Sequence, residues 1–350
     1  MPDRYKTNIH AVQSLKDYKF SGLDASLVGA VKSAADYYRI DVSTAWLYGI
    51  TGNAFLHILD ENLKEPNGGE VEPDVFRLVR NIGIDIQGLH QYANGEHLLQ
   101  LQKEMWEKAK LAIHAGKPVF AKNLDINNQT SLITAYDEAG YYTDSWHTGE
   151  KLAENVIPWT DLGFGRCTCI NCVQSRDKAE ISPLPVDRLI SLHWATSAPA
   201  ADPYIAFKET LAYAIRLNNE EQYTTAGKTY TVGHKAYQKW LASLKAGEVD
   251  AYYFSLFIEV LGEARRYAVQ FLTEAQEKLP ALDPSLLDDS IAIYNQIAAN
   301  YSILETMYPY SEPPVRELKE KERCIELISG IMHLEKKALD TLKKLYAHMI

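Results

Sequence analysis

The chain has 350 residues, of which 46% are hydrophobic and 23% charged, and its formal net charge is −10. This composition is typical of a globular protein, and the length predicts two domains. The negative charge argues against nonspecific nucleic-acid binding, which needs a basic face, and against docking on an anionic membrane. No run approaches the ~18 apolar residues of a membrane-spanning helix, and the first twenty residues lack a basic-then-apolar signal pattern. We therefore expect a cytoplasmic chain with reduced cysteines.

Helices come first in the N-terminal half, and strands follow. Apolar spacing, small residues and terminal glycines predict helices over 24–39, 73–82 and 96–115. Between the first two, residues 41–58 form a turn region rich in apolar side chains. β-Branched and aromatic residues predict strands over 118–124, 129–137, 139–143 and 189–195. This order indicates an α+β domain with helices packed on an antiparallel sheet, which we place at residues 1–198.

The C-terminal half reads as helical. A proline-containing stretch at 196–203 predicts a linker. Prolines and glycines then separate amphipathic segments, which predict helices over 204–218, 233–246, 250–278, 284–307 and 313–347. Long helices in series are typical of a bundle. The sequence therefore predicts an all-α domain over residues 199–350.

Four segments of the first domain occur in a characteristic order: a helix at 26–39, WLYGITGNAF from Trp46 to Phe55, YDEAGYY at 136–142, and Ile157-Pro158-Trp159. This ordered set resembles the butirosin biosynthesis protein H N-terminal-like family, which is related to the C39-type cysteine peptidases. The likeness covers about residues 10–195, and the helical half resembles the C-terminal part of relatives. It implies a papain-like scaffold with a helical extension.

The resemblance implies a thiol mechanism, in which a Cys that begins the early helix attacks a carbonyl, a His acts as base and an Asp or Asn orients it. Carried over position by position, these roles fall on Ser26, Gln129 and Asp144. A glutamine cannot accept a proton at neutral pH, so it cannot activate a serine. The triad is therefore expected to be degenerate. His147, in the loop after Asp144, is an alternative base.

A short run of cysteines is the sharpest local feature. Cys167, Cys169 and Cys172 lie within six residues, and three thiols can converge on one soft cation such as zinc. A fourth ligand would have to come from His147, His193 or Cys324. Only one cysteine cluster exists, whereas structural zinc sites usually combine two ligand pairs, so incidental loop cysteines are left open as an alternative.

From the missing catalytic pair, we expect a ligand-binding protein of the pseudoenzyme type. Its ligand would be a small molecule, a peptide or a carrier-bound acyl or aminoacyl group, held in a cleft between the domains. The resemblance suggests a secondary-metabolite pathway. No cofactor is expected, although zinc is left open, and so is a homodimer. The residues expected to contact the ligand are Trp46, Tyr136, Trp146, Tyr252 and Arg265.

Two alternatives stay open at this point. One is an active acyltransferase or amide hydrolase with a rearranged site built from Ser26, Asp144 and His147. The other is a metal-dependent interaction protein organised by the cysteine cluster.

Overall fold

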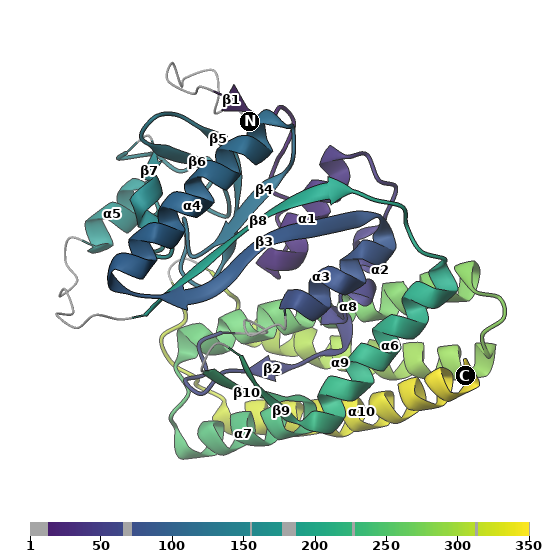
Figure 1. The fold of residues 1–350 in the computed structure, drawn as a ribbon. Coiled ribbons are helices and arrows are strands. Elements are labelled where there is room, and N and C mark those ends of the chain that lie inside the picture. Colours follow the sequence, from purple (N-terminus) through teal and green to yellow (C-terminus); the bar gives the residue numbers. More distant parts are fainter. Residues whose placement is uncertain are drawn as a thin grey trace. The chain divides into compact units, whose positions relative to one another are not determined.

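The computed structural model describes residues 13–65, 72–154, 156–176, 187–225, 228–311 and 314–349 (Figure 1). The chain forms two compact units: the first comprises Met1–Asp41 and Ile84–Ala198, and the second comprises Val42–Gly83 and Pro199–Ile350. The sequence predicts a single boundary after residue 198. The structure also has a boundary between residues 198 and 199. However, residues 42–83, which the prediction assigns to the first domain, belong to the second unit.

The first unit is built on a seven-stranded sheet in which every pairing is antiparallel. Its order is β3-β8-β4-β5-β6-β7, and β1 also pairs with β5. The strands are β1 (Gln13–Ser14), β3 (Ile84–Ala93), β4 (Val119–Lys122), β5 (Thr130–Tyr136), β6 (Gly140–Asp144), β7 (Ile157–Pro158) and β8 (Arg188–Ser197).

Helices cover both faces of this sheet. Helix α1 (Ser26–Tyr37) and helix α4 (Gly95–His114) lie on opposite faces (Figure 1), and both contact β5. All seven residues of β5 are buried, as a central strand covered on both faces requires. The 3-10 turn η4 (Trp159–Asp161) and the short helix α5 (Ile170–Arg176) complete the unit. The mixed helix-and-sheet prediction for this half is confirmed.

Strand β3 is a feature that the sequence analysis missed. It pairs with β8 over ten residues but has no neighbour on its other edge among the described strands. Polar residues such as Gln87 and Gln91 are exposed on it, so the pattern lacks the apolar run typical of a central strand. Strands β4, β5, β6 and β8 confirm the four predicted strands to within a few residues.

Helices make up most of the second unit. They are α2 (Thr44–Ile50), α3 (Glu72–Val79), α6 (Pro203–Glu220), α7 (Gly233–Ala246), α8 (Ala251–Lys278), α9 (Pro284–Met307) and α10 (Lys321–His348), with 3-10 turns η2 (Asn53–Phe55) and η3 (Arg80–Ile82). The last helix begins at Lys321, eight residues after the predicted start, and residue 313 itself lies outside the described residues.

The prediction of an all-α second domain is wrong in one respect. Strands β9 (Gln222–Thr225) and β10 (Lys228–Val232) form a hairpin, and β2 (Ile58–Leu59) pairs with β10 to make a three-stranded sheet. Its alternating Tyr and Thr residues favour strands, but the hairpin is short and interrupts a run of helices. The sheet explains in part why residues 42–83 lie in this unit.

Helix α2 supplies the rest of the explanation. It is buried from Ala45 to Ile50, so it needs apolar partners on all sides. The Trp46 and Phe55 rings lie 5.0 and 5.7 Å from the fully buried Phe271 ring of α8. Burial against this helix stabilises the segment in the second unit.

A charged and hydroxylated cluster occupies the core of the second unit. Arg265 is completely buried and donates from Nε to Glu335 at 2.5 Å and from Nη1 to the carbonyl of Leu56 at 3.0 Å. The hydroxyl of buried Tyr237 also reaches Glu335, at 3.2 Å. Burial, with the nearby Arg265 charge, lowers the pKa of His57 well below its usual value, so this histidine is neutral at physiological pH.

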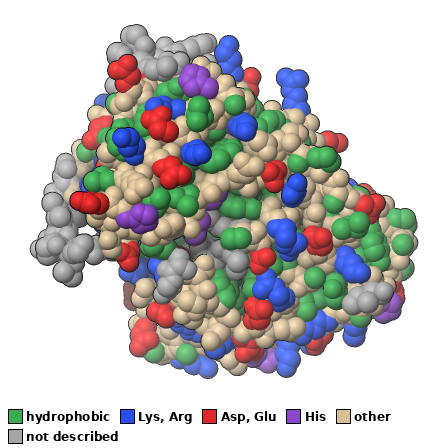
Figure 2. All heavy atoms as spheres, in the orientation of Figure 1, with side chains coloured by type: hydrophobic (Ala, Val, Ile, Leu, Met, Phe, Trp, Pro, Cys, Tyr) green, Lys and Arg blue, Asp and Glu red, His purple; other side chains and the backbone are tan. Residues whose placement is uncertain are grey.

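None of the described helices is long and apolar enough to cross a membrane. Among the described residues on the face in Figure 2, acidic and basic side chains are interspersed rather than sorted by sign.

Candidate metal centre

His147 lies in a turn that directly follows β6. Its backbone amide donates to the Ser145 hydroxyl at 3.2 Å, and the Thr148 amide donates to the Ser145 carbonyl at 3.0 Å. The Ser145 amide in turn donates to the Thr148 hydroxyl at 2.8 Å. These bonds close residues 145–148 into a compact turn that presents the half-buried His147 imidazole.

The three cysteines are brought to this turn by a backbone pairing further along the chain. The Ile170 amide donates to the Lys151 carbonyl at 2.9 Å, and the Ala153 amide to the Thr168 carbonyl at 2.8 Å. The segment after His147 is thereby paired with the segment that carries Cys167 and Cys169. Helix α5 then begins at Ile170 and carries Cys172 on its first turn.

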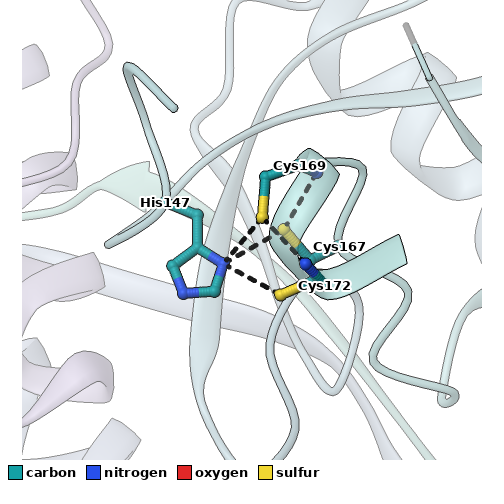
Figure 3. Close-up of side chains that lie close together, drawn as sticks. All are labelled: His147, Cys167, Cys169 and Cys172. Carbon is teal, nitrogen blue, oxygen red and sulfur yellow. Dashed lines mark hydrogen bonds between the residues drawn. The ribbon is translucent and has the colours of Figure 1, made fainter. Parts of the chain in front are cut away.

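The side chains of His147 and the three cysteines converge on one point (Figure 3). The Nδ1 atom of His147 lies 3.1 Å from Cys167 Sγ, 3.5 Å from Cys172 Sγ and 3.8 Å from Cys169 Sγ. All four ligand atoms lie within 4.8 Å of one another. Tetrahedral zinc, with its usual bond lengths, holds nitrogen and sulfur ligands about 3.6 Å apart. The group could therefore hold one metal ion.

Backbone amides point at two of the sulfurs. The Cys169 amide donates to Cys167 Sγ at 3.4 Å, and the Cys172 amide donates to Cys169 Sγ at 3.5 Å. Donation of this kind favours the thiolate, which is the form that binds metals. The backbone is thus already folded around the sulfurs in the arrangement that a thiolate centre needs.

Burial acts in the opposite direction. Cys167 and Cys169 are only 3% and 2% exposed. Burial raises the pKa of Cys167 far above its usual value, and the Asp125 carboxylate adds to the shift. Burial and hydrogen bonding with Cys169 raise the pKa of Cys172 to about 11. Without a cation these two thiols are therefore protonated at neutral pH, and a bound dication would supply the missing positive charge.

Asp125 is a residue that sequence reasoning missed. Its carboxylate is 2% exposed, and Oδ2 accepts from the Ser145 hydroxyl at 2.6 Å and from the Thr143 hydroxyl at 3.0 Å. Oδ1 is buried and makes no hydrogen bond with the described residues. A buried carboxylate beside buried thiols favours a bound cation. Nothing in the local sequence signals this role, because Asp125 reads as an ordinary loop residue.

Ser26 and Gln129 are brought close together. Ser26 begins α1, and its hydroxyl accepts from the amide of Thr130, the first residue of β5, at 3.0 Å. Gln129 directly precedes Thr130, and its Oε1 is buried without a hydrogen bond to the described residues. Asp144 ends β6 opposite Leu132 of β5. Among the described residues, however, no hydrogen bond joins the three side chains, and none joins His147 to Ser26.

The residues predicted to contact a ligand fall on both units. In the first unit, the Tyr136 hydroxyl bonds the His114 ring, and Trp146 is 43% exposed with its ring edge-on to Phe20. The other three belong to the second unit. There Trp46 is buried, with the Lys278 ammonium 4.4 Å from its ring, and the Tyr252 hydroxyl lies 2.9 Å from that of Tyr310. Arg265 lies in the core cluster described above. Ligand contact by all five stays a prediction.

No family model matches this chain, and neither does any of the curated proteins with which it was compared. The resemblance to the butirosin biosynthesis protein H family therefore stays an expectation from the sequence.

Proposed function

We propose that this is a zinc protein in which a structural Cys3His centre staples the turn after β6 to the segment that begins α5. The observation that carries the proposal is the convergence of His147 Nδ1 and three sulfurs within 4.8 Å. Thiolate and imidazole ligands suit zinc, and four protein ligands leave no open position for a reacting water. The centre would organise this edge of the first unit rather than perform chemistry.

A thiol nucleophile is the competing explanation for the 3.1 Å contact between His147 and Cys167. Reactive cysteines are partly exposed and have a lowered pKa. Cys167 is almost completely buried, and its pKa is raised. A Cys-His pair also leaves Cys169 and Cys172, which face the same nitrogen, without a role. Metal binding accounts for all four side chains.

Elemental analysis of protein purified without an affinity tag tests the proposal. We expect about one zinc per chain in the wild type, because thiolate sites bind zinc tightly. Cys169→Ser, which removes one ligand, is expected to lose most of it, whereas Cys324→Ala, which removes the cysteine of the second unit, is expected to keep it. A wild-type content below about 0.2 zinc per chain contradicts the proposal, given that affinity.

A second function is favoured by the placement of Ser26, Gln129 and Asp144. We propose that the first unit is a papain-like scaffold with a degenerate triad, which binds a small molecule, a peptide or a carrier-bound acyl group. The start of α1 lies against the start of β5, and β6 pairs beside β5. This arrangement supports the expected scaffold, while glutamine at the base position removes the proton acceptor.

Turnover assays separate binding from catalysis at this second site. We expect no hydrolysis or transfer from panels of thioesters and p-nitrophenyl esters, and no labelling of Ser26 by active-site hydrolase probes. Turnover by the wild type that disappears in Ser26→Ala would contradict the degenerate triad. It would then favour the active acyltransferase or hydrolase.

A further inference from the structure

We infer that Asp144, at the third position of the degenerate triad, is a positioning residue for the metal centre. This inference rests on the zinc centre proposed above. It reassigns a carboxylate that the papain-like mechanism would use to orient a base.

The two oxygens of Asp144 have different partners. Oδ2 accepts from the amide of Phe20, in the segment before α1, at 2.9 Å. Oδ1 accepts from the hydroxyl of Thr148, the residue after His147. Asp144 therefore connects the turn that carries His147 to a segment that lies 124 residues earlier in the sequence.

The Thr148 hydroxyl connects Asp144 to the backbone of the turn. It donates to Asp144 and accepts from the Ser145 amide at 2.8 Å, so one side chain closes the turn and anchors it. On the other side of the turn, the Ser145 hydroxyl accepts from the His147 amide and donates to buried Asp125. His147 is thus held between two carboxylate anchors, on a stretch that has no regular secondary structure.

Loss of the Asp144 carboxylate should make the position of the His147 imidazole less well defined, without affecting the positions of the cysteines. The cysteines are positioned by α5 and by the backbone pairing of residues 151–153 with residues 168–170. Among the described residues, Asp144 makes no hydrogen bond with either of these segments or with α5. Residues that orient metal ligands from outside the coordination shell typically contribute about 10–100-fold to affinity. We expect a loss of that size, with the three thiolates still bound.

The test compares Asp144→Ala with Asp137→Ala. Asp137 is a matched control because it also anchors a turn beside β6, but at the opposite end of that strand. It accepts from the amides of Ala139 and Gly140, where the chain turns from β5 into β6. Zinc affinity is measured by competition with a chromophoric chelator. The visible spectrum of the Co²⁺-loaded protein reports whether nitrogen still completes the tetrahedron.

We expect Asp144→Ala to weaken zinc binding by about 10–100-fold and to change the cobalt spectrum. Asp144→Asn, which keeps one acceptor oxygen, should restore part of the affinity. Asp137→Ala should lower stability but leave affinity and spectrum as in the wild type.

Wild-type affinity and spectrum in Asp144→Ala would overturn the inference while leaving the zinc centre intact. A wild type that binds no zinc would instead contradict the centre itself, so the two failures are distinguishable. If Asp144→Ala does not fold, Thr148→Val at an exposed position carries the same test. Weakened zinc binding in that variant supports the inference that Asp144 positions His147 through Thr148, and unchanged binding overturns it.

Discussion

Removal of zinc by a chelator is expected to destabilise the first unit by about 4 kcal/mol when free zinc had been a thousandfold above its dissociation constant. In the proposed centre the metal binds only the folded state, because its ligands come from two segments that folding brings together. Hydrogen exchange measures the effect locally. Amides of the paired segments, such as Ile170 and Ala153, should lose protection, while those of α8 to α10 should keep theirs.

The experiment is done with a non-metal-binding reductant, so that disulfide formation cannot imitate metal loss. Added zinc should restore protection, and added magnesium should not, because magnesium prefers oxygen ligands. The control variant Cys324→Ala, whose cysteine is buried in α10, should respond to the chelator as the wild type does. Unchanged protection around Cys167 and Cys169 after complete zinc removal would contradict a stapling role.

Glu335→Ala is expected to destabilise the second unit by about 3–5 kcal/mol, because it leaves the Arg265 guanidinium charged and unpaired in the core. Arg265 has no exposed surface, and the side chain of Glu335 is 13% exposed. Tyr237 loses a hydrogen-bond acceptor in the same variant. Urea unfolding, followed by the far-ultraviolet circular dichroism of the helices, measures the loss.

Two variants sharpen this prediction. Arg265→Met combined with Glu335→Leu should recover much of the lost stability, since apolar replacement of a buried ion pair is often neutral or stabilising. Glu326→Ala removes an exposed ion pair with Arg323 on the same helix and should cost at most about 1 kcal/mol. Equal losses in Glu335→Ala and Glu326→Ala would show that the buried pair has no special weight.

Local sequence patterns predicted the helices and strands of this chain better than they predicted which unit each element belongs to. The helices α7, α8 and α9 follow from residue spacing, because each buries an apolar stripe. The strands β4, β5 and β6 follow from their β-branched and aromatic residues, bounded by turn formers. That residues 42–83 belong to the second unit could not be predicted from local patterns. It depends on the pairing of β2 with β10 and on the fit of Trp46 against Phe271, which are long-range contacts.

The candidate site was predictable where its signal is local. Three cysteines within six residues point to a metal, and His147 was among three candidates for the fourth ligand. The structure selects His147 because the pairing of residues 151–154 with 168–170 folds the chain back on itself. The supporting residues Asp125 and Ser145 carry no such signal, since their importance comes from hydrogen bonds that only the folded turn creates.

X-ray absorption at the zinc edge of the purified wild type tests the central claim most directly. The Cys3His centre predicts a first shell of three sulfurs at about 2.3 Å and one nitrogen at about 2.0 Å. In Cys324→Ala this shell should be unchanged. A shell of oxygen and nitrogen atoms alone, or a sample without zinc, would contradict the centre built by His147, Cys167, Cys169 and Cys172.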